Sequence, residues 1–124
     1  MKKIASILVI VLAFTFNSNA QNKTIKTISL EQTKGEFTQK SLTVSEGTYI
    51  FEVSNNHAAK EVGFVLVRKG KDASKVENHI KTAYVTTVVK DGKVEKTNPT
   101  MLTEGEYVYF CPLNPTPQYT LIVE

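Results

Sequence analysis

Tryptophan is absent from this chain of 124 residues, and there is a single cysteine, Cys111. One cysteine excludes a disulfide within the chain, so a packed apolar core has to hold the fold together. The sequence has only one extended apolar run, residues 7–14. This run is much shorter than the roughly 20 residues that a membrane-spanning helix needs. The sequence therefore excludes a disulfide-stapled domain and predicts no membrane span.

The first twenty residues have the pattern of a secretory signal peptide. Lys2 and Lys3 precede the apolar run, and Ser18-Asn19-Ala20 supplies small residues for cleavage before Gln21. We expect a periplasmic or secreted protein of 124 − 20 = 104 residues. The predicted organisation is a signal peptide over 1–20, a tail and first strand over 21–31, and one domain over 32–124.

Neither sign of charge predominates in the predicted exported chain. Fifteen Lys and Arg stand against twelve Asp and Glu, and removal of Lys2 and Lys3 leaves 13 − 12 = +1. The strong basic footprint of a nucleic-acid-binding protein is therefore not expected. No nucleophile elbow, phosphate-binding loop or paired zinc-ligand spacing occurs either. We expect no catalytic residues, and a protein that is not an enzyme.

The composition from residue 21 onward favours β-strands. It contains fourteen Thr, twelve Val and five Tyr, which are residue types enriched in sheets. Alternating or continuous apolar patterns predict strands over 23–30, 37–44, 49–53, 62–67, 84–89, 107–111 and 119–123, and Asp91-Gly92 predicts a tight hairpin. Only residues 72–83 have helical spacing, with Asp72 as N-cap. The sequence predicts an all-β, Greek-key, two-sheet β-sandwich with one short helical insert at about 72–83.

An internal repeat supports the sandwich. Residues 44–51 match residues 102–109, and in each copy a glycine (Gly47 or Gly105) is followed two positions later by a tyrosine (Tyr49 or Tyr107). A tyrosine at such a position can bond back across a sandwich corner through its hydroxyl group. We interpret the two segments as two corners of one sandwich.

The end of the chain resembles that of the cupredoxins, the blue copper proteins. The resemblance is clearest over residues 102–111, where a Gly-x-Tyr-x-Tyr strand leads into Cys111, and over the last predicted strand at 119–123. Residues 42–56 and 62–66 also resemble the middle part of cupredoxin sequences. The resemblance covers about 32–124 and implies an exported domain of cupredoxin-like topology. It also implies a type 1 copper centre, which needs two imidazoles and one thiolate.

The copper ligands that the resemblance implies are incomplete in this sequence. The first histidine position falls on Lys60 or Val62, depending on register, and the second falls on Asn114. Only Cys111 is retained, and a free cysteine is often simply a small buried residue. We therefore predict an exported binding or interaction module without a cofactor or a type 1 copper centre. Its partner would be an unknown protein or small ligand.

The contact surface is expected at the proline-rich end of the sandwich. Pro112, Pro115 and Pro117 stiffen the loop after the cysteine, because each proline fixes its own φ angle. The candidate contact residues are Asn56, Lys60, Leu113, Asn114 and Tyr119. We expect a monomer, with a dimer linked through Cys111 as the other possibility.

A copper-binding alternative remains open from the sequence. Cys111 and His57, with Gln118 or Met101, could hold copper for copper transfer or electron transfer. The other histidine, His79, lies off the apolar stripe of the predicted helix and is expected to be exposed to solvent.

Overall fold

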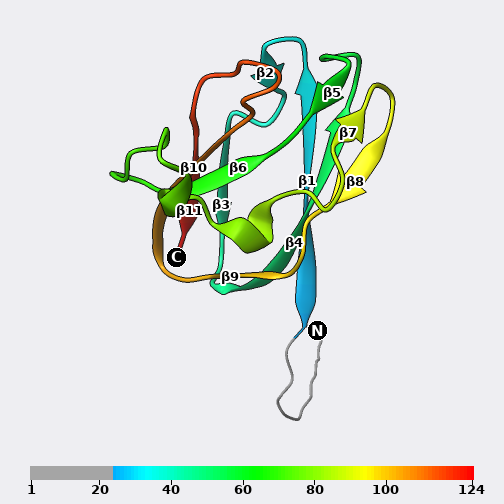
Figure 1. Ribbon diagram of the computed structural model, residues 1–124. Helices are drawn as coiled ribbons and strands as arrows, with labels where there is room; N and C mark the ends of the chain where they lie inside the picture. The colour runs from blue at the N-terminus through cyan, green and yellow to red at the C-terminus, as the bar shows by residue number, and fades with distance from the viewer. Residues whose placement is uncertain (1–23) are drawn as a thin grey trace, which may run out of the picture.

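A computed structural model describes residues 24–124 as two facing β-sheets and a small two-stranded sheet (Figure 1). The predicted signal peptide lies outside the described residues. The strands of the first sheet are β1 (Ile25–Thr33), β2 (Glu36–Phe37), β4 (Gly47–Asn55), β8 (Val94–Lys96) and β9 (Thr100–Leu102). Those of the second are β3 (Ser41–Val44), β6 (Val65–Arg68), β10 (Gly105–Phe110) and β11 (Tyr119–Val123), and β5 (Glu61–Val62) pairs with β7 (Val89–Lys90).

The order of the strands gives the sandwich its mixed topology. The first sheet runs β2-β1-β4-β8, with β9 also paired to β4, and the second runs β3-β11-β10-β6. β1 pairs with β4 in parallel, as β3 does with β11, whereas the other pairs are antiparallel. The predicted all-β two-sheet sandwich is confirmed. In the described residues, no helix is long and apolar enough to cross a membrane.

Two predicted strands are each divided between two sheets. The sequence predicts one strand over 37–44, but the beginning of this segment belongs to β2 in the first sheet and its end to β3 in the second. The segment 62–67 is likewise broken at Gly63 and Phe64 into β5 and β6. Each break is a place where the chain crosses from one sheet to another, and apolar periodicity carries no information about such a crossing.

The predicted helical insert is two short 3-10 helices, η3 (Val76–Asn78) and η4 (Lys81–Ala83). The expected N-cap is wrong, because the Asp72 carboxylate accepts hydrogen bonds from the main chain and hydroxyl of Ser74 instead. Val76, expected on the buried stripe, is 59% exposed. The Ile80 amide donates to the Leu66 carbonyl oxygen at 2.9 Å, so the insert is held against the edge of β6 and only its second half reaches the core.

The predicted turn at Asp91-Gly92 is present, but it does not join the strands of a hairpin. The Lys93 amide donates to the Lys90 carbonyl oxygen at 2.9 Å, and Gly92 has a φ of 79°. The strands on either side belong to different sheets, since β7 pairs with β5 and β8 pairs with β4. The turn therefore carries the chain from one sheet to another.

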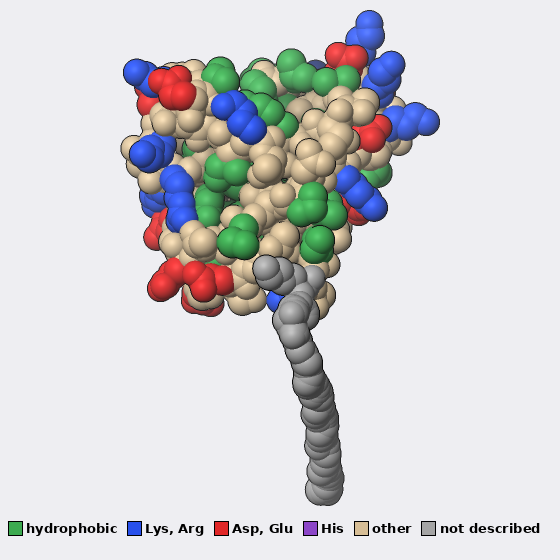
Figure 2. Space-filling model, turned by 60° about the horizontal axis from the view of Figure 1, so that its bottom comes forward, with side chains coloured by type: hydrophobic (Ala, Val, Ile, Leu, Met, Phe, Trp, Pro, Cys, Tyr) green, Lys and Arg blue, Asp and Glu red, His purple; other side chains and the backbone are tan. Residues whose placement is uncertain are grey.

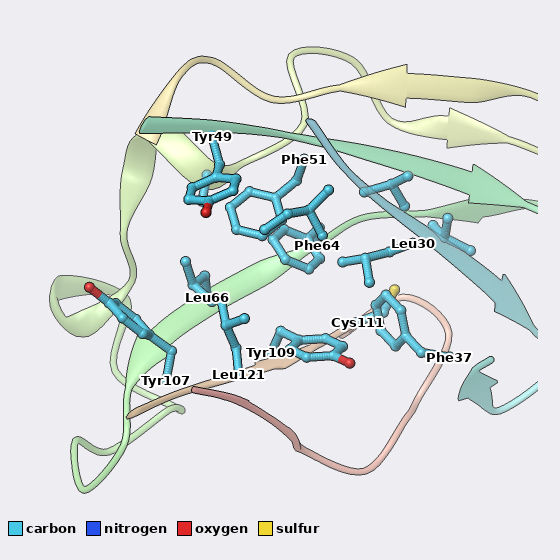
Figure 3. Close-up of a cluster of buried hydrophobic side chains, with 14 of the residues drawn as sticks. Leu30, Phe37, Tyr49, Phe51, Phe64, Leu66, Tyr107, Tyr109, Cys111 and Leu121 are labelled. Atoms are coloured by element: carbon cyan, nitrogen blue, oxygen red, sulfur yellow. The ribbon is translucent and has the colours of Figure 1, made fainter. Parts of the chain in front are cut away.

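Aromatic side chains from both sheets fill the core (Figure 3). The rings of Phe37 and Tyr109 meet edge to face with centroids 5.1 Å apart, and those of Phe51 and Phe64 lie 4.9 Å apart. All four residues are 2% exposed or less. Burial raises the pKa of Tyr109 to about 12, and its hydroxyl donates to the Gln39 carbonyl oxygen at 2.6 Å.

Both predicted tyrosine corners are present. The Tyr49 hydroxyl donates to the Ser45 carbonyl oxygen at 2.7 Å, and the Tyr107 hydroxyl donates to that of Thr103 at 3.3 Å. A cation lies over each ring as well, since Arg68 is 4.3 Å from the Tyr107 centroid and a lysine is 5.9 Å from the Tyr49 centroid. Corner geometry and cation–π contact together fix the two places where the chain turns between sheets.

The second corner leads to a stability prediction for Gly105→Ala. Gly105 has a φ of 137°, and a methyl group there would come within 2.5 Å of the Arg68 guanidinium, which donates to the Glu104 carbonyl oxygen. We expect Gly105→Ala to lower the free energy of unfolding by about 2–3 kcal/mol, through backbone strain and displacement of Arg68. Chemical denaturation measures this. The matched control is Gly92→Ala, where φ is 79° and nothing lies within 4 Å of the added methyl, so about 1 kcal/mol is expected. Equal losses in the two variants would contradict the role of Arg68.

Charged side chains of both signs surround the face of the molecule shown in Figure 2, and uncharged side chains occupy its middle. The ion pairs of the described residues are Glu36–Lys40, His57–Asp91 and Lys69–Glu106, all formed by exposed side chains. Exposed pairs of this kind contribute little to stability, so the core and the corners hold the sandwich together.

Candidate functional site

Cys111 follows directly after β10 and is fully buried, in the same core cluster as Phe37 and Leu30 (Figure 3). Its sulfur accepts two main-chain hydrogen bonds, from the Gly63 amide at 3.3 Å and from the Asn114 amide at 3.2 Å. Its own amide donates to the Thr116 hydroxyl at 3.0 Å, which closes the loop that follows. A disulfide to a second chain would require this end of the sandwich to open, because the sulfur has no exposed surface.

Asn114, three residues after the cysteine, points inward and is 3% exposed. Its side-chain oxygen accepts from the Gly35 amide at 2.8 Å. Its side-chain nitrogen donates to the Gln32 side-chain oxygen at 3.1 Å and to the Thr33 carbonyl oxygen at 2.9 Å. The Asn114 amide group is therefore satisfied by protein partners on the β1–β2 turn, and it ties the cysteine loop to that turn.

Gln32 completes the arrangement. It is fully buried, and its side-chain nitrogen donates to the Gly63 carbonyl oxygen at 2.8 Å. Gly63 thus accepts from Gln32 and donates to the Cys111 sulfur, while Asn114 contacts both Gln32 and the sulfur. We call these four residues (Gln32, Gly63, Cys111 and Asn114) the amide network.

The sequence pattern points to Cys111 and Asn114 but not to Gln32. The signal that could have found Gln32 is its position: it is in phase with Ile28 and Leu30, whose side chains face the core. A polar residue on the apolar face of a strand needs a buried hydrogen-bond partner. The sequence does not reveal which partner, since Asn114 lies 82 positions away.

The structure distinguishes the two positions, Lys60 and Val62, that the sequence left open for the first histidine. Gly63 bonds the sulfur, and its neighbour Val62 is fully buried, whereas Lys60 is exposed. Of the two positions, Val62 is therefore the one that is buried and adjacent to a residue bonded to the sulfur. The groups that bond the sulfur are the main-chain amides of Gly63 and Asn114, and the Gln32 and Asn114 side chains bond to each other within the same network.

The two histidines lie elsewhere and have other partners. His57 has a positive φ of 56°, and its Nδ1 lies 2.9 Å from the Asp91 carboxylate in an exposed pair. His79, expected to be exposed, is half-buried: its Nε2 donates to the Ala73 carbonyl oxygen at 2.8 Å, and its Nδ1 lies 2.6 Å from the Tyr84 hydroxyl. Neither imidazole contacts the cysteine.

The residues proposed as an alternative copper set are not brought together. Met101 is 66% exposed on β9, opposite Thr48, and Gln118 is an exposed loop residue. Among residues 24–124, no three or more His, Cys, Asp or Glu side chains are grouped so that they could hold a metal ion. Type 1 copper takes two imidazoles with the thiolate, so the residues around Cys111 do not fit that metal centre.

The predicted contact residues divide into exposed and buried ones. Leu113 is 51% exposed, and Asn56 and Lys60 are also exposed. Tyr119 is half-buried, and its hydroxyl accepts from the Phe37 amide at 3.3 Å. Asn114 was expected on this surface, but it is buried in the amide network and cannot offer its side chain to a partner.

A hollow lies beside this end of the molecule. It has a volume of about 330 Å³, which falls within the size range of small-ligand pockets. Most of its wall is apolar, and it is lined by Gly63, Phe64, Val65, His79, Tyr84, Val85 and Pro112. Gly63 therefore connects the hollow to the amide network.

The fold is similar to those of solved blue copper proteins. Auracyanin A from the green thermophilic photosynthetic bacterium Chloroflexus aurantiacus superposes with a TM-score of 0.65 at 20% identity, covering 82% of this chain and all of that one. Auracyanin B gives 0.62 at 17% identity (88% and 93% covered), and auracyanin from Roseiflexus castenholzii gives 0.61 at 18% (83% and 99% covered). These identities establish likeness of fold alone.

Sequence comparison extends the likeness to the family. No curated protein sequence matches the chain. The profile of the cupredoxin-like domain, however, matches residues 6–123, which is nearly the whole chain. On this match, and with the sandwich and the cysteine loop described above, the chain belongs to the cupredoxin-like domain family.

Proposed function

We propose that this protein is an exported, non-enzymatic binding module whose amide network stands in place of a type 1 copper centre. The observation that carries the proposal is the buried Asn114 side chain, which fills the position of the second histidine with a fully hydrogen-bonded amide. The signal-peptide pattern of residues 1–20 supports export.

Copper at Cys111 would have to displace this network. Binding would break the hydrogen bonds that Asn114 makes to Gly35, Gln32 and Thr33, and it would leave Gln32 buried without that partner. A buried polar group that loses its partner costs about 1–3 kcal/mol. In return the metal would gain one thiolate and no imidazole, which is a poor ligand set for type 1 copper.

The exposed end of the sandwich is suited to contact a partner. Asn114 and the three prolines hold the loop, so Leu113 is presented on a rigid support. Leu113 lies over Gly63, since a methyl group added at Gly63 would be 3.9 Å from a Leu113 methyl. Rigid presentation reduces the entropy lost on binding. Leu113, Asn56 and Lys60 are therefore the residues that we assign to the contact surface.

The copper part of the proposal is tested by spectroscopy. Purified protein mixed with Cu(II) is expected to stay colourless, without the strong visible band of a copper–thiolate bond. Metal analysis of protein purified from its native host is expected to find no stoichiometric copper. An intense blue or green solution, or one copper ion per chain, would refute the proposal. Titration with Cu(I) against Cys111→Ser separates adventitious binding, which is equal in the two proteins, from binding at the thiol.

The binding part is tested with matched surface variants. Leu113→Asp is expected to abolish chemical cross-linking to a partner in the exported protein fraction of the host. Ile122→Asp is the control, because Ile122 is a similarly exposed aliphatic residue (37%) on β11, outside the assigned surface. Equal cross-linking by the two variants would remove Leu113 from the interface.

A further inference from the structure

The lower half of β1 is a sheet edge without a described partner. β1 pairs with β4 over its full length from Ile25 to Gln32, but on its other side β2 covers only Gln32 and Thr33 (Figure 1). The next stretch of that side is covered by the Thr38 amide, which donates to the Glu31 carbonyl oxygen at 2.9 Å, and by the Gln39 side chain, which accepts from the Glu31 amide at 2.9 Å. Coverage of this edge ends there.

The phase of the strand shows which main-chain groups are left over. The amide and carbonyl of Glu31 both point away from β4, so by the period of two in a strand those of Ser29, Thr27 and Ile25 point the same way. No pairing of these groups occurs among residues 24–124. At three alternate positions along this extended edge, these donors and acceptors thus have no partner within the described residues.

Apart from one lysine, the devices that usually protect an edge strand are missing from the described part of this one. The segment 25–29 contains no proline and no bulge in its pairing with β4. Its single charge, Lys26, lies 5.9 Å from the Tyr49 ring centroid, over a corner of the sandwich. Ile25, Thr27 and Ser29 are uncharged, and all three are exposed. An extended edge that carries one charge and neither a proline nor a bulge is open to pairing with another strand.

We infer that β1 is a dimerisation edge, along which two copies of this protein pair antiparallel about a two-fold axis at Thr27. Thr27 then faces Thr27 of the second copy, and Ile25 faces Ser29 in both directions. Each facing pair exchanges two main-chain hydrogen bonds, so all three free positions are satisfied reciprocally. Uncharged residues meet across the axis, and facing threonines are a favourable cross-strand pair.

The register follows from the groups that are already occupied. An axis at Ser29 would set Thr27 against Glu31, whose amide and carbonyl are taken by Gln39 and Thr38. An axis at Ile25 would leave Thr27 and Ser29 without partners in the described chain. A second copy centred on Thr27 is the arrangement that uses all the free groups. It replaces the monomer expected from the sequence, and it does not involve Cys111.

The register is tested by single-cysteine cross-linking. Facing residues of a hydrogen-bonded antiparallel pair have Cα atoms about 5.5 Å apart, which is within the range of a disulfide. Thr27→Cys is therefore expected to form a disulfide-linked dimer under mild oxidation. Ser29→Cys is the matched control, because four strand residues, about 13 Å, separate it from its symmetry mate. An equimolar mixture of Ile25→Cys and Ser29→Cys is expected to cross-link as well.

Light scattering after size exclusion tests the dimer without cysteine variants. The protein is expected to dimerise as its concentration rises. The Thr27→Lys variant is expected to raise the dissociation constant of the dimer at least about tenfold, because it sets two ammonium groups against each other. The control is Thr43→Lys, on the edge strand β3 of the other sheet, which is expected to leave the dissociation constant of the dimer unchanged. A monomer at every concentration, or cross-linking by Ser29→Cys as fast as by Thr27→Cys, would overturn the inference.

Discussion

Replacing both Val62 and Asn114 by histidine is expected to give a protein that turns blue or green with Cu(II), whereas the parent protein stays colourless. Gly63 and Asn114 already bond the Cys111 sulfur through their main-chain amides, so the main chain near both substituted positions is close to the thiol. Two imidazoles and a thiolate form the type 1 ligand set. Visible absorption and electron paramagnetic resonance of the Cu(II) protein check the result.

The control for this double variant is Lys60→His with Asn114→His. It has the same number of new imidazoles and tests the other register that the sequence allowed. Lys60 is exposed and lies away from the sulfur, so its replacement is expected to give no strong visible band. Equal colour in both double variants would show that Val62 is not the position beside the thiol. A colourless Val62→His, Asn114→His protein with native-like circular dichroism would show that the site is not latent.

Local patterns in the sequence predicted the strands and corners that depend on local chemistry. β11 has the bounds expected from its alternation, and both glycine–tyrosine corners form the expected hydroxyl bonds. The errors lie where tertiary contacts determine the local structure. Residues 72–83 have helical spacing, but they form two short 3-10 helices. The Ile80 amide bonds to Leu66 on β6, and Val76 is exposed, so the segment does not bury a helical face.

At the candidate site as well, the sequence indicated a residue but not its distant contacts. The resemblance to the cupredoxins, through the spacing of three residues after Cys111, drew attention to Asn114. Its role as a buried link could not be predicted, because its partners Gln32, Thr33 and Gly35 lie at the other end of the chain. Only the folded sandwich brings the β1–β2 turn onto the cysteine loop.

Asn114→Leu is expected to lower the free energy of unfolding by about 2–4 kcal/mol. Leucine has the same number and branching of side-chain heavy atoms as asparagine, so no cavity is created and the loss comes from hydrogen bonds. Gln32, which is fully buried, loses the donor to its side-chain oxygen, whereas Gly35 is exposed and Thr33 is half-buried, so water can replace part of what they lose. Chemical denaturation of the two proteins at the same pH measures the difference. A loss below about 0.5 kcal/mol, the level of an ordinary surface substitution, would contradict the proposed role of the network.

A double-mutant cycle with Gln32→Leu separates the Gln32–Asn114 contact from the rest of the network. Each single variant leaves one buried amide facing an apolar side chain, but the double variant removes both groups that faced each other. The double variant is therefore expected to lose about 1–2 kcal/mol less than the sum of the two single losses. Strict additivity would mean that the two amides stabilise the protein independently. A coupling of the expected size would show that the β1–β2 turn and the cysteine loop are joined through this buried pair.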